Sequence, residues 1–343
     1  MTTVFFATNR KLVAGPEFSN EFDGRLDELR FGKVDFNGTE LFKQDADALG
    51  QQGRIQVADE QMNAADGTLS QVGSKAIFSE VRAAMQASQD AVIYLHGYNY
   101  TFRAAAARAA QLQQWLAAGG CDLVMFMFAW PSEGAGVAPR TYSDDRERAK
   151  SSGLALARAL LKAADFIRNT PRAGRCDGRI HLIAHSMGNW ALRGAVQAMR
   201  TFVGDNIPPL FEEVLLVAAD EDDDTLTDPK KMAQITRGCR RVTVYYNQQD
   251  LALKSSDVAM GNPDRLGRSG PQNRSGLLAK IVPVNVSPAI IREATGPQSW
   301  TQDESGHQYY RNNAVVRADL VQVLQGKLDI EGRIKREDYY RLG

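Results

Sequence analysis

Residues 179–192 read RIHLIAHSMGNWAL, and this stretch predicts a strand that turns directly into a helix. The run 180–184 is short and apolar, whereas the residues from Gly188 onward are rich in Ala and Leu, as helices are. Ser186 lies at the junction, flanked two positions away by Ala184 and Gly188. Small residues are needed there because the strand and helix backbones approach closely, and the turn residue itself is strained with its side chain directed outward. Ser186 is therefore a candidate nucleophile; the alternative is a simple helix cap.

The composition excludes several classes of protein. The 343 residues carry 41 basic and 41 acidic side chains, so charge gives no reason to expect nucleic-acid binding. No run approaches the roughly 18 to 20 apolar residues of a membrane helix, and the opening MTTVFFATNRKL lacks the apolar core of a secretion signal. Cys121, Cys176 and Cys239 are scattered, which argues against a disulfide framework. We expect a cytoplasmic protein with no membrane insertion.

From residue 91 onward, apolar runs alternate with helical ones. The predicted strands are 91–95, 123–130, 179–184, 213–219, 241–246 and 281–286, and the predicted helices are 103–118, 149–167, 189–199, 230–238 and 313–324. Strands that are apolar on both faces and separated by helices indicate an α/β fold with a mostly parallel central sheet and helices on both faces. Shorter strands at 3–7, 31–36 and 54–57 precede a helix at 78–87, and a loop is expected at 132–145.

We expect a single domain over residues 1–343. In it, residues 1–75 contribute antiparallel edge strands and loops, and residues 76–325 form the core. Only about 20 residues separate the fourth and fifth parallel strands, which is enough for one helix but not for a large cap domain.

A nucleophilic serine needs a neutral imidazole as its base, and the chain has four histidines. His181 lies inside a predicted strand, and His185 is adjacent to Ser186, where the turn directs neighbouring side chains apart. His96 precedes Ser186 at the end of the first parallel strand. His307 lies far downstream in a polar loop after the last strand, and elimination favours it as the base.

An acid must orient that imidazole, and ligands in such sheets bind beyond the carboxyl ends of the strands. Asp250 lies four residues past the strand 241–246 and is favoured as a single acid in a polar loop. Asp220 and Asp222 follow the strand 213–219 and remain alternatives, although a run of acidic residues is more typical of a solvated surface.

The charge that develops on the substrate oxygen needs backbone N–H donors. The residue after the nucleophile, Met187, supplies one of them. Tyr98 is the candidate for the second, because Gly97 in the sequence His96-Gly97-Tyr98 lets the backbone turn close to the substrate.

The order of Ser186, Asp250 and His307, together with the AHSMG turn and the HGY strand end, resembles the alpha/beta-hydrolases. More closely, the chain resembles a bacterial alpha/beta-hydrolase family of uncharacterised function. The resemblance spans roughly Val4 to Leu320 and is carried by FFATNR, IYLHGYN, FAWPS, IAHSMGN and YYNQQDLAL. It implies Ser186 as nucleophile, Asp250 as acid, His307 as base, and Tyr98 and Met187 as oxyanion donors. Ala184 stands where the general motif has Gly, but it is also small.

The implied chemistry is a two-step acyl transfer without a metal or organic cofactor. We expect a carboxylesterase that cleaves small or medium acyl esters; an acyltransferase, lipase or thioesterase on the same triad, or a non-catalytic binding scaffold, are the alternatives. The site is expected between the turn 130–132 and the loops 134–142 and 255–276, which form a partial lid. Trp130 and Tyr98 are candidates for an apolar acyl or alcohol pocket, with core filling as the alternative for Trp130.

Overall fold

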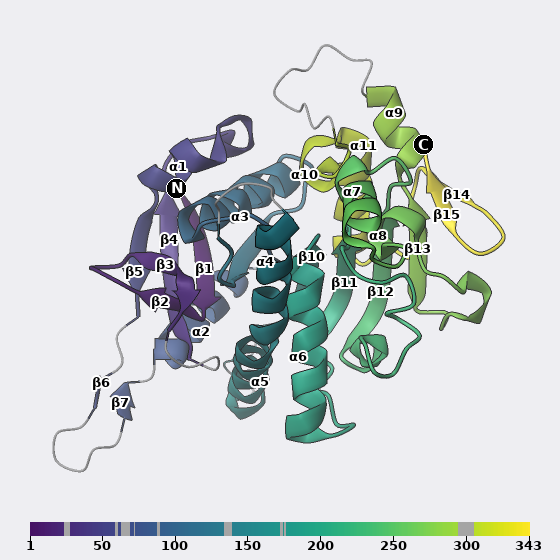
Figure 1. The fold of residues 1–343 in the computed structure, drawn as a ribbon. Helices are drawn as coiled ribbons and strands as arrows, with labels where there is room; N and C mark the ends of the chain where they lie inside the picture. Colours follow the sequence, from purple (N-terminus) through teal and green to yellow (C-terminus); the bar gives the residue numbers. More distant parts are fainter. Residues whose placement is uncertain are drawn as a thin grey trace.

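The computed structural model describes residues 1–23, 28–58, 61–62, 69–71, 73–87, 90–133, 139–171, 174, 176–293 and 305–343, and Figure 1 shows their arrangement. Within these residues, no helix combines the length and the apolar character that crossing a membrane requires.

In the described residues, eleven strands form one sheet in the order β14-β15-β13-β12-β11-β10-β8-β9-β1-β4-β5. They are β1 (Thr2–Thr8), β4 (Arg30–Phe36), β5 (Arg54–Val57), β8 (Asp90–Leu95), β9 (Leu123–Ala129), β10 (Ile180–His185), β11 (Phe211–Val217), β12 (Cys239–Tyr246), β13 (Ile281–Asn285), β14 (Arg333–Lys335) and β15 (Tyr340–Leu342). In this order, neighbouring strands pair in parallel from β15 across to β1. Antiparallel pairing adds β4 and β5 at the N-terminal edge and β14 at the opposite edge. The predicted mostly parallel sheet with antiparallel N-terminal edge strands is therefore confirmed.

Two short antiparallel pairs in the described part of the chain lie outside this sheet. They are β2 (Arg10–Leu12) with β3 (Phe18–Phe22), and β6 (Gln61–Met62) with β7 (Leu69–Gln71).

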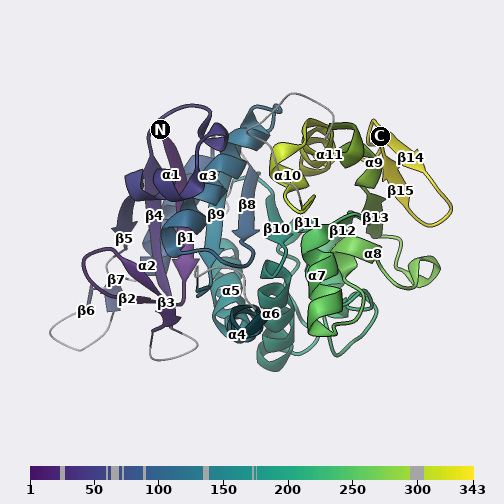
Figure 2. The same ribbon diagram turned by 45° about the horizontal axis from the view of Figure 1, so that its top comes forward.

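Helices cover both faces of the sheet (Figure 2). One face carries α1 (Ala46–Gln52), α3 (Phe102–Ala117), α10 (Tyr309–Asn312) and α11 (Ala314–Leu324); the other carries α2 (Gly73–Met85), α4 (Pro139–Ser151), α5 (Gly153–Asn169) and α6 (Gly188–Val203). Strand β8 shows the reason: Val92 and Tyr94 pack with the first set, while Ala91 and Ile93 pack with the second. Alternate side chains of a strand point to opposite faces, so a strand that is apolar throughout needs two helical layers.

The other helices whose bounds the structure describes lie in the connections after β4, β11, β12 and β13. They are η1 (Leu41–Lys43), η3 (Ala233–Arg237), α7 (Leu251–Met260), α8 (Leu266–Ser269), η4 (Arg274–Gly276) and α9 (Ser287–Glu293). Between β11 and β12, η3 is the helix that the structure places in residues 218–238, which confirms that no large cap domain is inserted there.

The structure differs from the prediction around residues 132–167. The predicted helix 149–167 is two helices, and the first of them, α4, already begins at Pro139 inside the predicted loop. Proline suits the first turn of a helix because its missing N–H would have no partner there. The second, α5, begins at Gly153, where an added Cβ would lie 2.3 Å from the backbone of Gly194 in α6. Such a close helix crossing is possible only without side chains at the contact.

Candidate active site

Ser186 lies between the last residue of β10 and the first residue of α6, with a φ angle of 50°. This left-handed conformation is costly for a residue other than glycine. Gly188 packs against the end of β8, and a Cβ there would lie 2.6 Å from the carbonyl oxygen of His96 and 2.7 Å from that of Leu95. The elbow thus has the strain and the crowding that the steric argument predicted, although the crowding at position 188 comes from a neighbouring strand.

Three hydrogen bonds that the sequence analysis missed hold the elbow in place. The Nδ2 atom of Asn189 donates to the carbonyl oxygens of Ala184, at 3.1 Å, and Ser186, at 2.9 Å. The backbone N–H of Asp220 also donates to the carbonyl oxygen of Ser186, at 3.2 Å. The sequence signal for Asn189 was a polar residue at the start of an otherwise apolar helical run. The structure shows that its side chain is fully buried, and buried polar groups need hydrogen-bond partners.

His307 and Asp250 form a direct pair. Nδ1 of His307 lies 2.7 Å from Oδ2 of Asp250, and both side chains are buried. The other carboxylate oxygen of Asp250 accepts the backbone N–H of Leu253 at 2.9 Å and so caps α7. The carboxylate is therefore fixed by a helix end, and it fixes the orientation of the imidazole in turn.

The loop that carries His307 lies beside the elbow. The His307 ring is 4.9 Å, between centroids, from the ring of His185, the residue that precedes Ser186. The same loop is anchored to the end of β12: Leu251 N–H donates to the carbonyl oxygen of Ser305 at 2.8 Å, and the amide of Asn247 donates to that of Gly306 at 2.8 Å. Residues 186, 250 and 307 thus lie together beyond the carboxyl ends of the parallel strands.

The other histidines lie in the core. His181 is buried within β10, where its Nε2 lies 3.3 Å from a carboxylate oxygen of Asp90. The ring of His185 packs between His307 and Tyr310, and burial holds its pKa well below the ordinary value. Burial, reinforced by the nearby Arg10 charge, lowers the pKa of His96 to about 3.

The loop after β8 approaches the elbow at Gly97. A Cβ on Gly97 would lie 3.1 Å from the Cβ of Ser186 and 2.8 Å from Nδ1 of His185, so the Gly97–Tyr98 backbone passes beside the nucleophile candidate. The Oγ atom of Ser132 accepts the backbone N–H groups of Asn99, at 2.8 Å, and Tyr100, at 3.2 Å, and holds the loop from behind. Ser132 belongs to the FAWPS motif, and the structure gives this motif a supporting role.

Trp130 lies behind the same loop with no exposed surface. Its ring stacks on His96 at 5.0 Å, and its Nε1–H donates to the carbonyl oxygen of His96 at 2.9 Å. Complete burial favours the core-filling alternative, and a role of Trp130 in an acyl pocket stays a prediction. The phenol of Tyr98, by contrast, is half-buried and faces α4, where its hydroxyl lies 2.8 Å from Oγ1 of Thr141.

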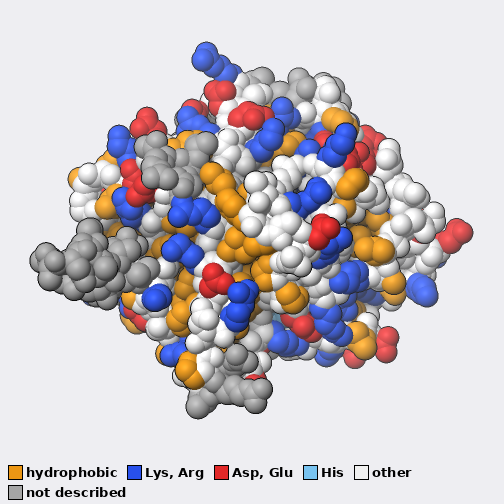
Figure 3. All heavy atoms as spheres, turned by 90° about the horizontal axis from the view of Figure 1, so that it is seen from below, with side chains coloured by type: hydrophobic (Ala, Val, Ile, Leu, Met, Phe, Trp, Pro, Cys, Tyr) orange, Lys and Arg blue, Asp and Glu red, His pale blue; other side chains and the backbone are white. Residues whose placement is uncertain are grey.

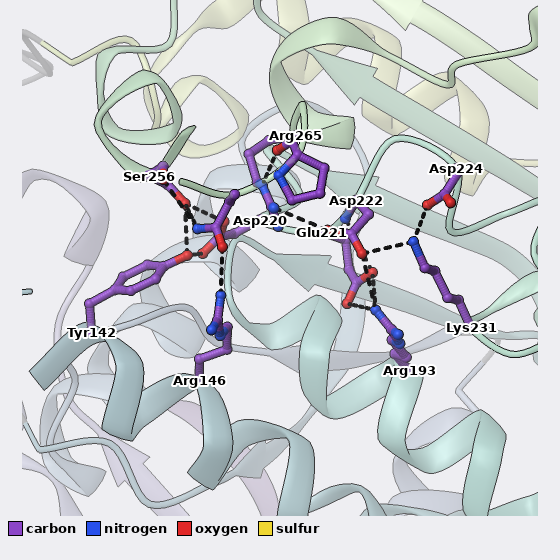
Figure 4. Close-up of polar contacts among 12 residues, drawn as sticks. Tyr142, Arg146, Arg193, Asp220, Glu221, Asp222, Asp224, Lys231, Ser256 and Arg265 are labelled. Atoms are coloured by element: carbon purple, nitrogen blue, oxygen red, sulfur yellow. Dashed lines mark hydrogen bonds and ion pairs between the residues drawn. The ribbon is translucent and has the colours of Figure 1, made fainter. Parts of the chain in front are cut away.

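The carboxylate of Asp220 contacts side chains of α4 and α7 (Figure 4). One oxygen accepts the Tyr142 hydroxyl at 2.6 Å, and the other accepts the Ser256 hydroxyl at 3.2 Å. These contacts connect the loop after β11 to two helices that border the site. The burial of Tyr142 and the neighbouring charge of Asp220 both raise the pKa of the Tyr142 phenol, so it stays a hydrogen-bond donor.

The acidic run after β11 was expected to be a solvated surface, and this expectation is wrong. Asp220 is 2% exposed and Glu221 is 0% exposed. Asp222 lies 2.9 Å from Nζ of Lys231 and 3.0 Å from the guanidinium of Arg265 (Figure 4). The sequence could not predict these ion pairs, because Lys231 and Arg265 belong to different segments that only folding brings to Asp222.

Glu221 lies in the same network. Arg193 of α6 contacts its carboxylate at 3.2 Å. Burial nevertheless dominates and raises the pKa of Glu221 to about 7. In the ranges that the structure describes, no group of three or more His, Cys, Asp and Glu side chains is arranged to hold a metal ion.

The fold and the elbow agree with the family to which the sequence is similar. A family described as alpha/beta hydrolase of unknown function (DUF900) matches residues 74–323. The chain belongs to this family. The matched residues of this alpha/beta hydrolase include the elbow at Ser186 and the paired Asp250 and His307. No curated protein and no solved structure gives a significant match to the chain.

Proposed function

We propose that the protein is a serine hydrolase that cleaves carboxylic esters with small or medium acyl chains. The observation that carries the proposal is the buried His307–Asp250 hydrogen bond of 2.7 Å, located beside an elbow where Ser186 has a φ angle of 50°. Strain at a nucleophile and a base oriented by an acid are the two features that make an ordinary hydroxyl reactive.

In the proposed mechanism, Ser186 attacks the acyl carbonyl while His307 takes its proton. Because Nδ1 of His307 is held by Asp250, Nε2 is the ring nitrogen that serves as base. The Asp250 carboxylate then stabilises the imidazolium. The protonated His307 gives its proton to the leaving alcohol, and water repeats the sequence to release the acid and restore the Ser186 hydroxyl.

The backbone N–H groups of Tyr98 and Met187 are the proposed donors to the oxyanion. Two observations support this proposal: Gly97 lies against the Cβ of Ser186, and Met187 is the N-cap residue that directly precedes α6. The first N–H groups of a helix lack intrahelical partners and favour negative charge. Each donor of this kind contributes about 2.7–4 kcal/mol of transition-state stabilisation in comparable hydrolases.

Hydrolysis of p-nitrophenyl acetate, butyrate and octanoate by the purified protein tests the proposal. We expect turnover that is abolished in Ser186→Ala, with the same circular dichroism spectrum for both proteins. A rate that rises sharply with added alcohol would instead indicate an acyltransferase. No burst and no turnover with any chain length in the folded wild-type protein would indicate a non-catalytic scaffold.

A further inference from the structure

An apolar cavity lies away from the elbow, between α2, α5 and the β8-β9-β10 region of the sheet. Its volume is about 160 Å³, and it opens to solvent. Small side chains explain it: Ala159 and Ala163 of α5 and Ala91 of β8 line the space where larger residues would fill a close-packed core. Figure 3 shows the underside of the molecule, where hydrophobic side chains reach the surface among basic ones.

The wall of the cavity is aromatic and aliphatic. Phe78, Phe126 and Phe166 form part of it, with Phe78 and Phe166 5.7 Å apart between ring centroids. An engineered cavity of similar volume, lined by Leu, Ile and Phe, stays dry and binds benzene. The space is therefore suited to about six carbon atoms of an apolar ligand.

The described part of the lining includes a cation, Arg82 of α2. Its guanidinium lies 5.7 Å from the centroid of the Phe166 ring, and its Nε is buried without a hydrogen-bond partner in the part of the chain that the structure describes. Among the described residues, no carboxylate forms an ion pair with Arg82. A buried donor without a partner is costly, and a guanidinium binds a carboxylate through two parallel hydrogen bonds.

We propose that this cavity binds a medium-chain carboxylic acid, with the chain against the aromatic wall and the carboxylate on Arg82. The positive charge of Arg82 favours a ligand with an anionic head group over an uncharged lipid. The cavity volume of about 160 Å³ limits the length of the hydrocarbon chain that can be buried. The inference does not rest on the proposed esterase activity, since it uses none of the residues at the elbow.

Cys176 provides a local readout because it also lines the cavity and is partly exposed. Cys121 and Cys239 are buried, which raises their pKa values to about 11 and about 12, so they react slowly with alkylating reagents. We expect octanoate to slow the alkylation of Cys176 by iodoacetamide severalfold, in the wild-type protein and equally in Ser186→Ala. Acetate, which lacks the chain, should give no protection.

Two variants and one control complete the test. Arg82→Gln should raise the octanoate concentration needed for protection by at least about tenfold, and Ala159→Phe should abolish protection by filling the cavity. Lys162→Gln removes an exposed cation from α5 outside the cavity lining and should change nothing. The proposal is overturned if octanoate does not protect Cys176, if octan-1-ol protects as well as octanoate, or if Arg82→Gln and Lys162→Gln behave alike.

Discussion

The backbone N–H of Asp220 donates to the carbonyl oxygen of Ser186 at 3.2 Å, while the Asp220 carboxylate points to Tyr142 and Ser256. This residue therefore supports the elbow through its main chain, and its side chain is occupied elsewhere. Asp250 has the reverse arrangement, because its carboxylate is the partner of His307. Of the three acids that the sequence left open, Asp220 and Asp250 thus differ in the partners of their side chains, and Asp222 contacts Lys231 and Arg265.

The first prediction compares these two acids. Asp250→Asn should lower kcat for p-nitrophenyl esters by about 10⁴-fold, because the amide favours the wrong tautomer of the imidazole. Asp220→Asn should lower kcat by less than about tenfold, since the main-chain contact to Ser186 remains. Steady-state kinetics on both variants provide the measurement, and a larger loss in Asp220→Asn than in Asp250→Asn would show that the acid is misassigned.

The second prediction concerns strain at the nucleophile candidate. Both Ser186→Ala and Ser186→Gly should be inactive, but the glycine variant should be more stable than the alanine variant by about 0.5–1 kcal/mol. Glycine relieves about 1–2 kcal/mol of left-handed backbone strain but increases the entropy of the unfolded chain by about 0.5–1 kcal/mol. Urea denaturation of the two variants measures the difference. A glycine variant that is less stable than the alanine variant by about 0.5–1 kcal/mol, which is the entropy cost alone, would mean that the φ angle of 50° carries no strain.

The third prediction concerns the loop after β8. In Gly97→Ala the new Cβ would meet Nδ1 of His185 at 2.8 Å, so the loop must move away from Ser186. We expect kcat to fall by about 10²-fold or more, as when one oxyanion donor is lost, with little change in KM. Gly238→Ala is the matched control, because its Cβ would lie 3.3 Å from a methyl group of Ile207. An unchanged kcat in Gly97→Ala would remove Tyr98 from the mechanism.

The fourth prediction separates two roles for Trp130. Trp130→Phe keeps a ring to stack on His96 but loses the donor to its carbonyl oxygen. Stability should fall by about 1–1.5 kcal/mol, and kcat should fall by one common factor for acetyl, butyryl and octanoyl esters. A change in chain-length preference would contradict this expectation and place Trp130 in the substrate pocket.

The fifth prediction concerns pH and His96. Because the pKa of His96 is about 3 in the folded protein and 6.5 in an unstructured peptide, the unfolded chain binds the extra proton first as pH falls. Stability from this residue is complete above about pH 6.5 and declines below it, by up to about 1.4 kcal/mol per pH unit. His96→Phe should make the free energy of unfolding less dependent on pH between about 5 and 6.5. Urea denaturation over that range tests it, and an unchanged slope would mean that His96 does not contribute.

Local sequence patterns determined much of this protein. The apolar runs predicted the parallel strands to within a few residues, because a strand buried on both faces cannot tolerate polar side chains. The small residues around Ser186 predicted the elbow, because close backbone approach is a local steric requirement. The chain order of Ser186, Asp250 and His307, each placed beyond a strand, also predicted that residues 250 and 307 would meet.

Only the tertiary structure decided the features that depend on partners far apart in the chain. The burial of Asp220 and Glu221, the position of Trp130 behind the loop after β8, and the cavity beside Arg82 are of this kind. The sequence around a carboxylate does not indicate whether the group will be exposed to water or buried in an ion pair with a distant arginine. That choice follows from which helices pack over the end of the sheet, and packing is a property of the whole folded chain.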